Sequence, residues 1–202
     1  MVDFKNLNTK ENIMLAAKKE FLSVGYKDAS LRTICKNAGV TTGALYFFFK
    51  NKEDLLDTIL LPVIEGYKKL IRNLFTGARE SNEYSTGDSM LIEYLYENRE
   101  VAIILIDKCR GTKYDELLKN VRDGMKHGFE SLFKANGITD FDDSLVEILV
   151  SMKIDGYLNI LKNNYTHDQL KSLSSKISVY WDCGFFSLLQ EMKKQRNSEP
   201  GL

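Results

Sequence analysis

The sequence predicts an all-α protein of about nine helices, and three observations support that fold class. The chain of 202 residues contains only two prolines, which leaves room for long uninterrupted helices. Apolar residues recur at spacings of three and four, and no segment alternates for long enough to build a sheet. Polar capping residues stand where the helices would begin, and glycines stand where several would end.

The first three expected helices are short and lie within the first 50 residues. Their expected ranges are 10–24, 31–37 and 42–49. We expect Thr9, Ser30 and Thr41 to be the N-caps, and Gly25 and Gly39 to end the first two helices. A tight turn at Gly39 and Val40 joins the second helix to the third, which is the geometry of a helix-turn-helix.

The first 50 residues, with their three short helices, are called the head below. Six longer or more irregular helices are expected after it. Their ranges are 52–75, 89–98, 100–109, 113–135, 141–163 and 167–194. We expect Asn51 and Asp140 to cap two of them, and Thr166 with Gln169 to form a capping box at the last. Residues 76–88 are rich in turn-forming residues and are expected to be a loop.

The charges are unevenly distributed along a chain whose net charge is zero. Residues 1–52 carry nine Lys and Arg against four Asp and Glu, while the remainder carries 19 basic and 24 acidic residues. A basic first quarter suggests that the front end of the chain meets a polyanion. A solvated basic face is the alternative.

Several classes of protein are not expected. No apolar run approaches the roughly 20 residues of a membrane span, and the first residues lack a signal-type apolar stretch, so we expect a cytoplasmic protein without a membrane partner. The histidines and the three cysteines fit no metal-binding spacing, so neither a metal nor a cofactor is expected. No nucleophile, base and orienting group stand at a motif spacing, so an enzyme is not expected.

Residues 16–56, AAKKEFLSVGYKDASLRTICKNAGVTTGALYFFFKNKEDLL, carry a family pattern. The matching positions are Phe21, Gly25, Tyr26, Ser30, Ile34, Gly39, Val40, Gly43, Leu45, Tyr46, Phe49, Lys52 and Leu55. This segment resembles the N-terminal DNA-binding domain of TetR-type (TetR/AcrR) transcriptional regulators. Two departures stand out: Thr42 replaces a frequent lysine, and Phe47 and Phe48 replace residues that are often polar.

The resemblance implies a DNA-binding domain over residues 1–52 and an effector-binding and dimerisation domain over residues 53–202. It implies a homodimeric, sequence-specific repressor that a small apolar or amphipathic ligand releases from a palindromic operator. The alternative is a helical protein–protein interaction module whose helix-turn-helix no longer reads DNA, and the unusual Phe47–Phe48 pair keeps this alternative open.

The expected DNA contacts lie in and around the helix-turn-helix. They are Ser30, Arg32, Thr41, Thr42, Gly43, Ala44, Tyr46, Phe47 and Lys52. The resemblance implies that the Tyr46 hydroxyl meets a DNA phosphate. Lys52 is expected to bind a phosphate because it lies at the start of the fourth helix, beside its backbone amides. A phenyl ring at Phe47 would contact a thymine methyl group, with packing against the first helix or a neighbouring chain as the alternative. Capping and ordinary surface exposure are the alternatives for the serine, the threonines and the arginine.

Two further sets of residues belong to the expected second domain. A ligand pocket could be lined by Ile64, Tyr67, Leu95, Ile104, Asp107, Tyr114, Leu118, Arg122, Met152 and Asp155, most of which could equally be filled core. The last two long helices are apolar on more than one side, which predicts packing on two sides. The resemblance implies that these two helices pair with those of a second copy, so a dimer interface is expected at Gly156, Tyr157, Ile160, Trp181, Gly184, Phe185 and Leu188, with a larger core of the single chain as the alternative.

Overall fold

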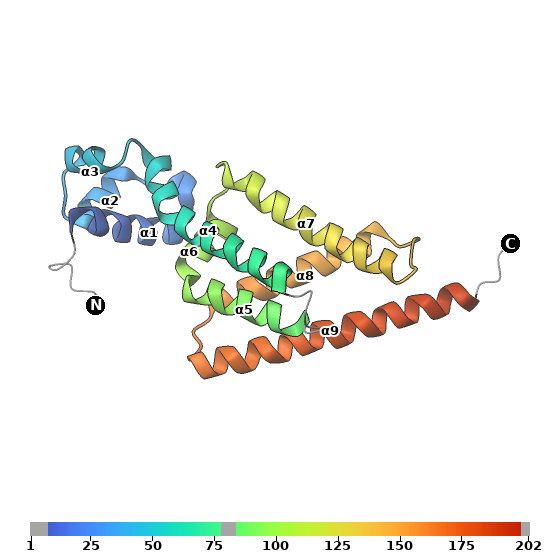
Figure 1. Cartoon of the computed structure of the whole chain (residues 1–202). Coiled ribbons are helices and arrows are strands. Elements are labelled where there is room, and N and C mark those ends of the chain that lie inside the picture. Colours follow the sequence, from blue (N-terminus) through green and yellow to red (C-terminus); the bar gives the residue numbers. More distant parts are fainter. Residues whose placement is uncertain (1–7, 78–83, 199–202) are drawn as a thin grey trace. The chain divides into compact units, whose positions relative to one another are not determined.

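The computed structural model describes residues 8–77 and 84–198, and every regular element within them is helical (Figure 1). The helices are α1 (Thr9–Asp28), α2 (Leu31–Ala38), α3 (Thr42–Phe48), α4 (Lys52–Gly77), α5 (Tyr84–Glu97), α6 (Arg99–Ile103), α7 (Tyr114–Ala135), α8 (Asp143–Lys162) and α9 (His167–Ser198). A π-helical turn, Ile104–Lys108, continues α6. The all-α prediction is confirmed.

The chain divides into two compact units. Unit 1 comprises Met1–Ile71 and Leu95–Asp115, and unit 2 comprises Arg72–Tyr94 and Glu116–Leu202. Unit 1 thus takes in more of the chain than the predicted DNA-binding domain of residues 1–52. That predicted boundary is functional rather than structural, and it stays a prediction.

The beginning of α1 differs from the prediction. Asn8, not Thr9, is the N-cap, because its side chain accepts a hydrogen bond from the Glu11 N–H while the Glu11 carboxylate accepts one from the Asn8 N–H. This reciprocal pair is a capping box. At the other end, Gly25 has a φ of 80° and interrupts the helical geometry as expected.

The caps around the helix-turn-helix match the prediction. The Ser30 hydroxyl accepts a hydrogen bond from the Thr33 N–H, and the Thr41 hydroxyl accepts one from the Ala44 N–H. Gly39 ends α2 with a φ of 69°, in the left-handed region that favours glycine. Asn51 caps α4 through the Asp54 N–H. These caps fix where α2, α3 and α4 begin.

Unit 1 is built on a core that its first four helices share. The apolar faces of these helices contribute the fully buried side chains Ile13, Ala17, Phe21, Ile34, Leu45, Leu55, Leu56 and Leu60. Phe49, directly after α3, is also buried. Because Leu45 and Phe49 lie four residues apart, they turn the same side of α3 toward this core. The opposite side of α3 therefore faces outward.

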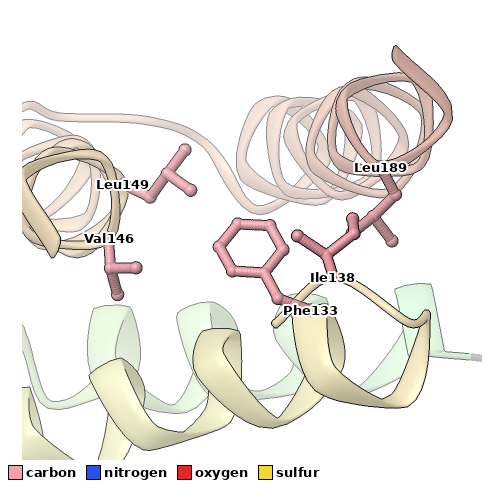
Figure 2. Packing of buried hydrophobic residues seen from close by; sticks show 5 residues of the cluster. All are labelled: Phe133, Ile138, Val146, Leu149 and Leu189. Carbon is pink, nitrogen blue, oxygen red and sulfur yellow. The ribbon is translucent and has the colours of Figure 1, made fainter. Parts of the chain in front are cut away.

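Unit 2 has its own hydrophobic cluster, shown in Figure 2. Phe133 of α7 and Ile138 of the following turn lie among side chains of α8 and α9. The α8 and α9 members are Val146, Leu149 and Leu189. The Phe133 ring also contacts the rings of Phe141 and Phe185, at centroid distances of 5.0 and 5.5 Å. This cluster joins the three long helices of unit 2.

Two predicted helix starts in this part of the chain are wrong. The N-cap of α8 is Asp142 rather than Asp140, because the chain stays extended while Phe141 packs against the Phe133 cluster. Helix α5 begins at Tyr84, so residues 84–88 are helical where a loop is expected. Residues 78–83 of that expected loop lie outside the described residues. The Thr166–Gln169 capping box at α9 is confirmed by both of its hydrogen bonds.

Within the described parts of the chain, no helix is both long and apolar enough to cross a membrane.

Candidate nucleic-acid interface

The outer side of α3 presents two aromatic rings. Tyr46 is 53% exposed and Phe47 is 82% exposed. Phe48 is 36% exposed, and its ring meets the Phe47 ring edge to face with centroids 5.0 Å apart. The exposure of Phe47 rules out packing against α1 as its role within this chain. Phe48 lies between its two neighbours, with its ring centroid 6.4 Å from that of Phe49.

The N-terminal end of α3 is open on its outer side. Thr41, Thr42 and Gly43 are exposed, and Ala44 is half-buried. A Cβ atom added at Gly43 would meet only the Thr41 Oγ1, at an ordinary 3.8 Å. Glycine inside a helix is unfavourable by roughly 1 kcal/mol relative to alanine. No contact among the described residues requires this glycine.

Both threonine hydroxyls at this end of α3 also have partners inside the protein. The Thr41 Oγ1 caps the helix, as described above. Burial raises the pKa of the Cys35 thiol, and the Thr42 hydroxyl beside it lowers that pKa by a smaller amount. Each of these two hydroxyls therefore has a neighbour within the protein besides any contact it makes with DNA.

Ser30 and Arg32 flank the start of α2. Both side chains are exposed, and Ser30 caps its helix through its hydroxyl while its N–H donates to the Glu20 carboxylate at 3.3 Å. Arg32 lies in the first turn of α2, with its guanidinium on the surface. Lys36, one turn later, is exposed as well. These residues add positive charge beside the uncharged α3.

The structure gives Lys52 a different role from the predicted phosphate anchor. Its ammonium donates to the backbone carbonyls of Tyr26, Lys27 and Ala29 at 2.7, 3.2 and 2.9 Å. It also lies 4.6 Å from the centre of the Tyr26 ring. A lysine has three N–H donors, so these carbonyls use all of them. Lys52 therefore fastens the start of α4 to the end of α1.

Lys50 is an exposed cation near α3 that is not among the predicted DNA contacts. It lies in the turn between α3 and α4, and its side chain is exposed. Its backbone N–H donates to the Asp54 carboxylate at 2.8 Å, which fixes the turn while leaving the ammonium on the surface. Its position two residues after α3 was the signal that could have identified it.

The ten predicted pocket residues do not form one site within either unit. Ile64, Tyr67, Leu95, Ile104, Asp107 and Tyr114 belong to unit 1, whereas Leu118, Arg122, Met152 and Asp155 belong to unit 2. Ile64, Leu95, Ile104 and Tyr114 are buried, and the other two of unit 1 are half-buried. In unit 2, Leu118 is half-buried and the other three are exposed.

Tyr114 has a well-defined polar partner inside unit 1. Its hydroxyl donates to the Asp57 carboxylate at 2.6 Å, and Lys113 makes an ion pair with the same carboxylate. Burial and this hydrogen bond raise the pKa of Tyr114, so the phenol stays protonated at neutral pH. The pair connects α4 to the start of α7, and it explains Tyr114 as a structural residue.

The predicted dimer residues fall into two groups. Tyr157 and Ile160 are buried within unit 2 and act as core residues of the single chain. Gly156 and Gly184 are exposed, while Trp181, Phe185 and Leu188 are half-buried. A cavity of about 140 Å³ lies between α8 and α9. Its lining residues are Leu149, Met152, Tyr180, Trp181, Gly184, Phe185 and Leu188. Exposed apolar side chains on the same two helices are Ile148, Met152, Val179, Tyr180 and Phe186.

Comparison with known proteins identifies the helix-turn-helix. Residues 13–59 match the family described as "Bacterial regulatory proteins, tetR family". The match therefore covers α1 from residue 13 onward, α2, α3 and the first turns of α4, including every predicted DNA contact. No residue of unit 2 lies within it.

Relatives extend this match beyond the head. YhgD, an uncharacterised HTH-type transcriptional regulator of Bacillus subtilis, is 26% identical over 61% of this chain and 72% of its own. The HTH-type transcriptional repressor BepR of Brucella suis is 44% identical, but over only 26% of this chain and 25% of its own.

Solved structures agree in fold. The transcriptional regulator FadR of Bacillus subtilis, in complex with stearoyl-CoA, aligns with 84% of this chain and 96% of its own. Its TM-score is 0.54 at 20% identity, a likeness of fold. The relatives matched by sequence are transcriptional regulators, not enzymes. The match at residues 13–59 and the long match to YhgD agree with the expected resemblance to TetR-type regulators, and the all-helical fold is like that of FadR.

Proposed function

We propose that this regulator is a homodimeric repressor that binds a palindromic DNA operator through α3 and leaves it when a small amphipathic ligand binds. The observation that carries the DNA-binding part is the outward side of α3. Leu45 and Phe49 fix one side of this helix in the core, so that Tyr46 and Phe47 are held in the open. An α-helix placed this way fits the major groove of B-form DNA.

Contacts to the DNA backbone would come from groups around α3. The Tyr46 hydroxyl, the Lys50 ammonium and the Arg32 guanidinium are exposed and reach phosphates or, for the arginine, a guanine edge. Gly43 and Ala44 let the start of α3 approach the groove closely. Ser30, Thr41 and Thr42 add hydroxyl contacts to their roles inside the head. Phe47 would contact a thymine methyl group.

The dimer part rests on unit 2. The exposed apolar side chains of α8 and α9 and the exposed Gly156 and Gly184 form a surface suited to a second copy of the same helices. We expect Phe186→Glu, which puts a charge at a ring that is 61% exposed, to shift the protein from dimer to monomer. Sedimentation velocity would measure the change. Leu61→Glu, at an apolar residue of α4 that is 43% exposed, is the control and should leave the dimer intact.

The repressor and effector parts rest on relatives. BepR, 44% identical in the head, is named a repressor, and FadR, of similar fold, is described with stearoyl-CoA bound. The position of the effector site stays a prediction, because the residues expected to line it are divided between the two units. Release would require that the ligand bind one conformation of the protein more tightly than the DNA-binding one.

Selection of bound sequences from random duplex DNA tests this function. Purified protein should recover a palindrome, and binding to it should weaken steeply as salt is raised. Recovery of no sequence by folded dimer at low salt would contradict the proposal. It would favour the interaction module, for which the exposed Phe47–Phe48 pair is the supporting observation.

A further inference from the structure

The side chains of α3 lack the groups that normally read base edges through hydrogen bonds. Arginine and lysine read guanine, asparagine and glutamine read adenine, and acidic side chains read cytosine. The helix Thr42–Phe48, TGALYFF, contains none of these residue types. Its one threonine, Thr42, can contact either kind of base edge and therefore discriminates little between bases. Base recognition by this helix must therefore depend largely on apolar contact.

Phe47 is the apolar group that is free to make such a contact. Its ring is 82% exposed, and the edge-to-face contact with Phe48 supports it from behind. The apolar feature that a base pair offers in the major groove is the methyl group at C5 of thymine. Cytosine methylated at C5 carries the same methyl group at the same ring position. A phenyl ring forms no hydrogen bond that would distinguish the O4 of thymine from the N4 amino group of cytosine.

We propose that Phe47 makes α3 a reader of C5-methyl groups, which accepts 5-methylcytosine in place of thymine at the base it contacts. The inference rests on the proposed function, because it requires that α3 enter the major groove. Binding to a site with cytosine at this position would then rise when that cytosine is methylated. The regulator would in this way respond to the methylation state of its DNA as well as to its sequence.

The test uses the duplex recovered by selection. Each thymine of one half-site is first replaced singly by uracil, which removes only the methyl group, and the position with the largest loss is kept. Burial of one methyl group corresponds to about a four-fold change in affinity. At the kept position, we expect thymine and 5-methylcytosine to bind within a factor of about two, and uracil and cytosine about four-fold more weakly than either.

Two variants connect the effect to the ring. Phe47→Ala should bind all four duplexes with nearly equal affinity, whereas Phe47→Leu should keep a reduced methyl preference. Because the side chain is exposed, both variants should unfold at the temperature of the wild type, which checks that the head is intact. The contrast between the two variants separates loss of the apolar contact from any general weakening of DNA binding.

The outcomes separate this inference from the proposed function. If a palindrome is recovered but uracil binds as well as thymine at every position, the methyl inference is overturned and the DNA-binding function stands. The inference is also overturned if 5-methylcytosine binds no better than cytosine, or if Phe47→Ala keeps the preference. If no duplex is recovered, the proposed function fails and the inference fails with it.

Discussion

The head and unit 2 both expose apolar side chains, but in different settings. In the head, Phe47 and its partly covered neighbour Phe48 lie on a seven-residue helix, close in sequence to exposed basic and hydroxyl residues. In unit 2, exposed apolar residues are spread along α8 and α9, two long helices. The arrangement in the head suits DNA, which is a polyanion that also presents thymine methyl groups. The arrangement in unit 2 suits another apolar protein surface. The residues around an exposed apolar side chain therefore indicate which kind of partner it fits.

The largest expected effect contrasts a buried ring of unit 2 with the exposed ring of the head. Phe133 is fully buried among three helices, so Phe133→Ala should lower the free energy of unfolding by about 3–5 kcal/mol. Phe47→Ala should change it by less than about 0.5 kcal/mol. Chemical denaturation followed by circular dichroism measures both. A large loss of stability in Phe47→Ala would show that its ring is packed in solution.

The next effect separates two neighbouring lysines of the head. Lys52→Ala removes a charged donor from three carbonyls, and one such hydrogen bond contributes about 1.5–3 kcal/mol, so we expect a loss of about 2–3 kcal/mol in stability. Lys50→Ala should leave stability unchanged and reduce the slope of log affinity against log salt by about 1. The assignment is contradicted if Lys52→Ala leaves stability unchanged and reduces the salt slope while Lys50→Ala does not. The Lys52 ammonium would then bind a DNA phosphate.

Two glycines of the helix-turn-helix should respond to alanine with opposite signs. Gly39→Ala forces a side chain into a left-handed conformation and should cost about 1–2 kcal/mol of stability. Gly43→Ala fits the helix without a clash and should add about 0.5–1 kcal/mol, while weakening DNA binding. Thermal unfolding and a binding titration test the pair. Unchanged affinity in Gly43→Ala would remove the argument for close approach to DNA.

The smallest effect concerns thiol chemistry. Burial raises the pKa of Cys109 to about 12, so its reactive thiolate is scarce at pH 8 in the folded state. Cys183 is exposed, and iodoacetamide should modify it first. Mass spectrometry of the modified peptides checks the order of reaction.

The same pKa shift makes stability depend on pH. Because the folded state holds the Cys109 proton more tightly than the unfolded state, the stabilising contribution of the protonated thiol should be lost as pH rises from about 9 toward 12.

The head was largely predictable because its signals are local. Ser30, Gly39 and Thr41 act through backbone atoms a few residues away, and each adopts its expected role. Where several candidates stand together, tertiary packing decides between them. Asp142 rather than Asp140 caps α8 because Phe141 is needed in the Phe133 cluster.

The candidate site was predictable only in outline. The spacing of Leu45 and Phe49 indicates which side of α3 is buried, and hence that Phe47 is exposed. The partners of Lys52 are carbonyls more than 20 residues earlier, and no local pattern reveals them. Apolar residues such as Tyr157 and Ile160 look the same in sequence whether they fill a core or face a partner, so their burial had to come from the structure.

The most direct test of the account is the spacing of the two half-sites in the recovered palindrome. Two identical heads of a dimer read half-sites about one helical turn apart, on the same face of the duplex. Inserting about five base pairs between the half-sites rotates one of them to the opposite face. We expect the affinity of the intact protein to fall by at least about tenfold, to the level of a single half-site. Unchanged affinity would contradict a dimeric operator-binding regulator.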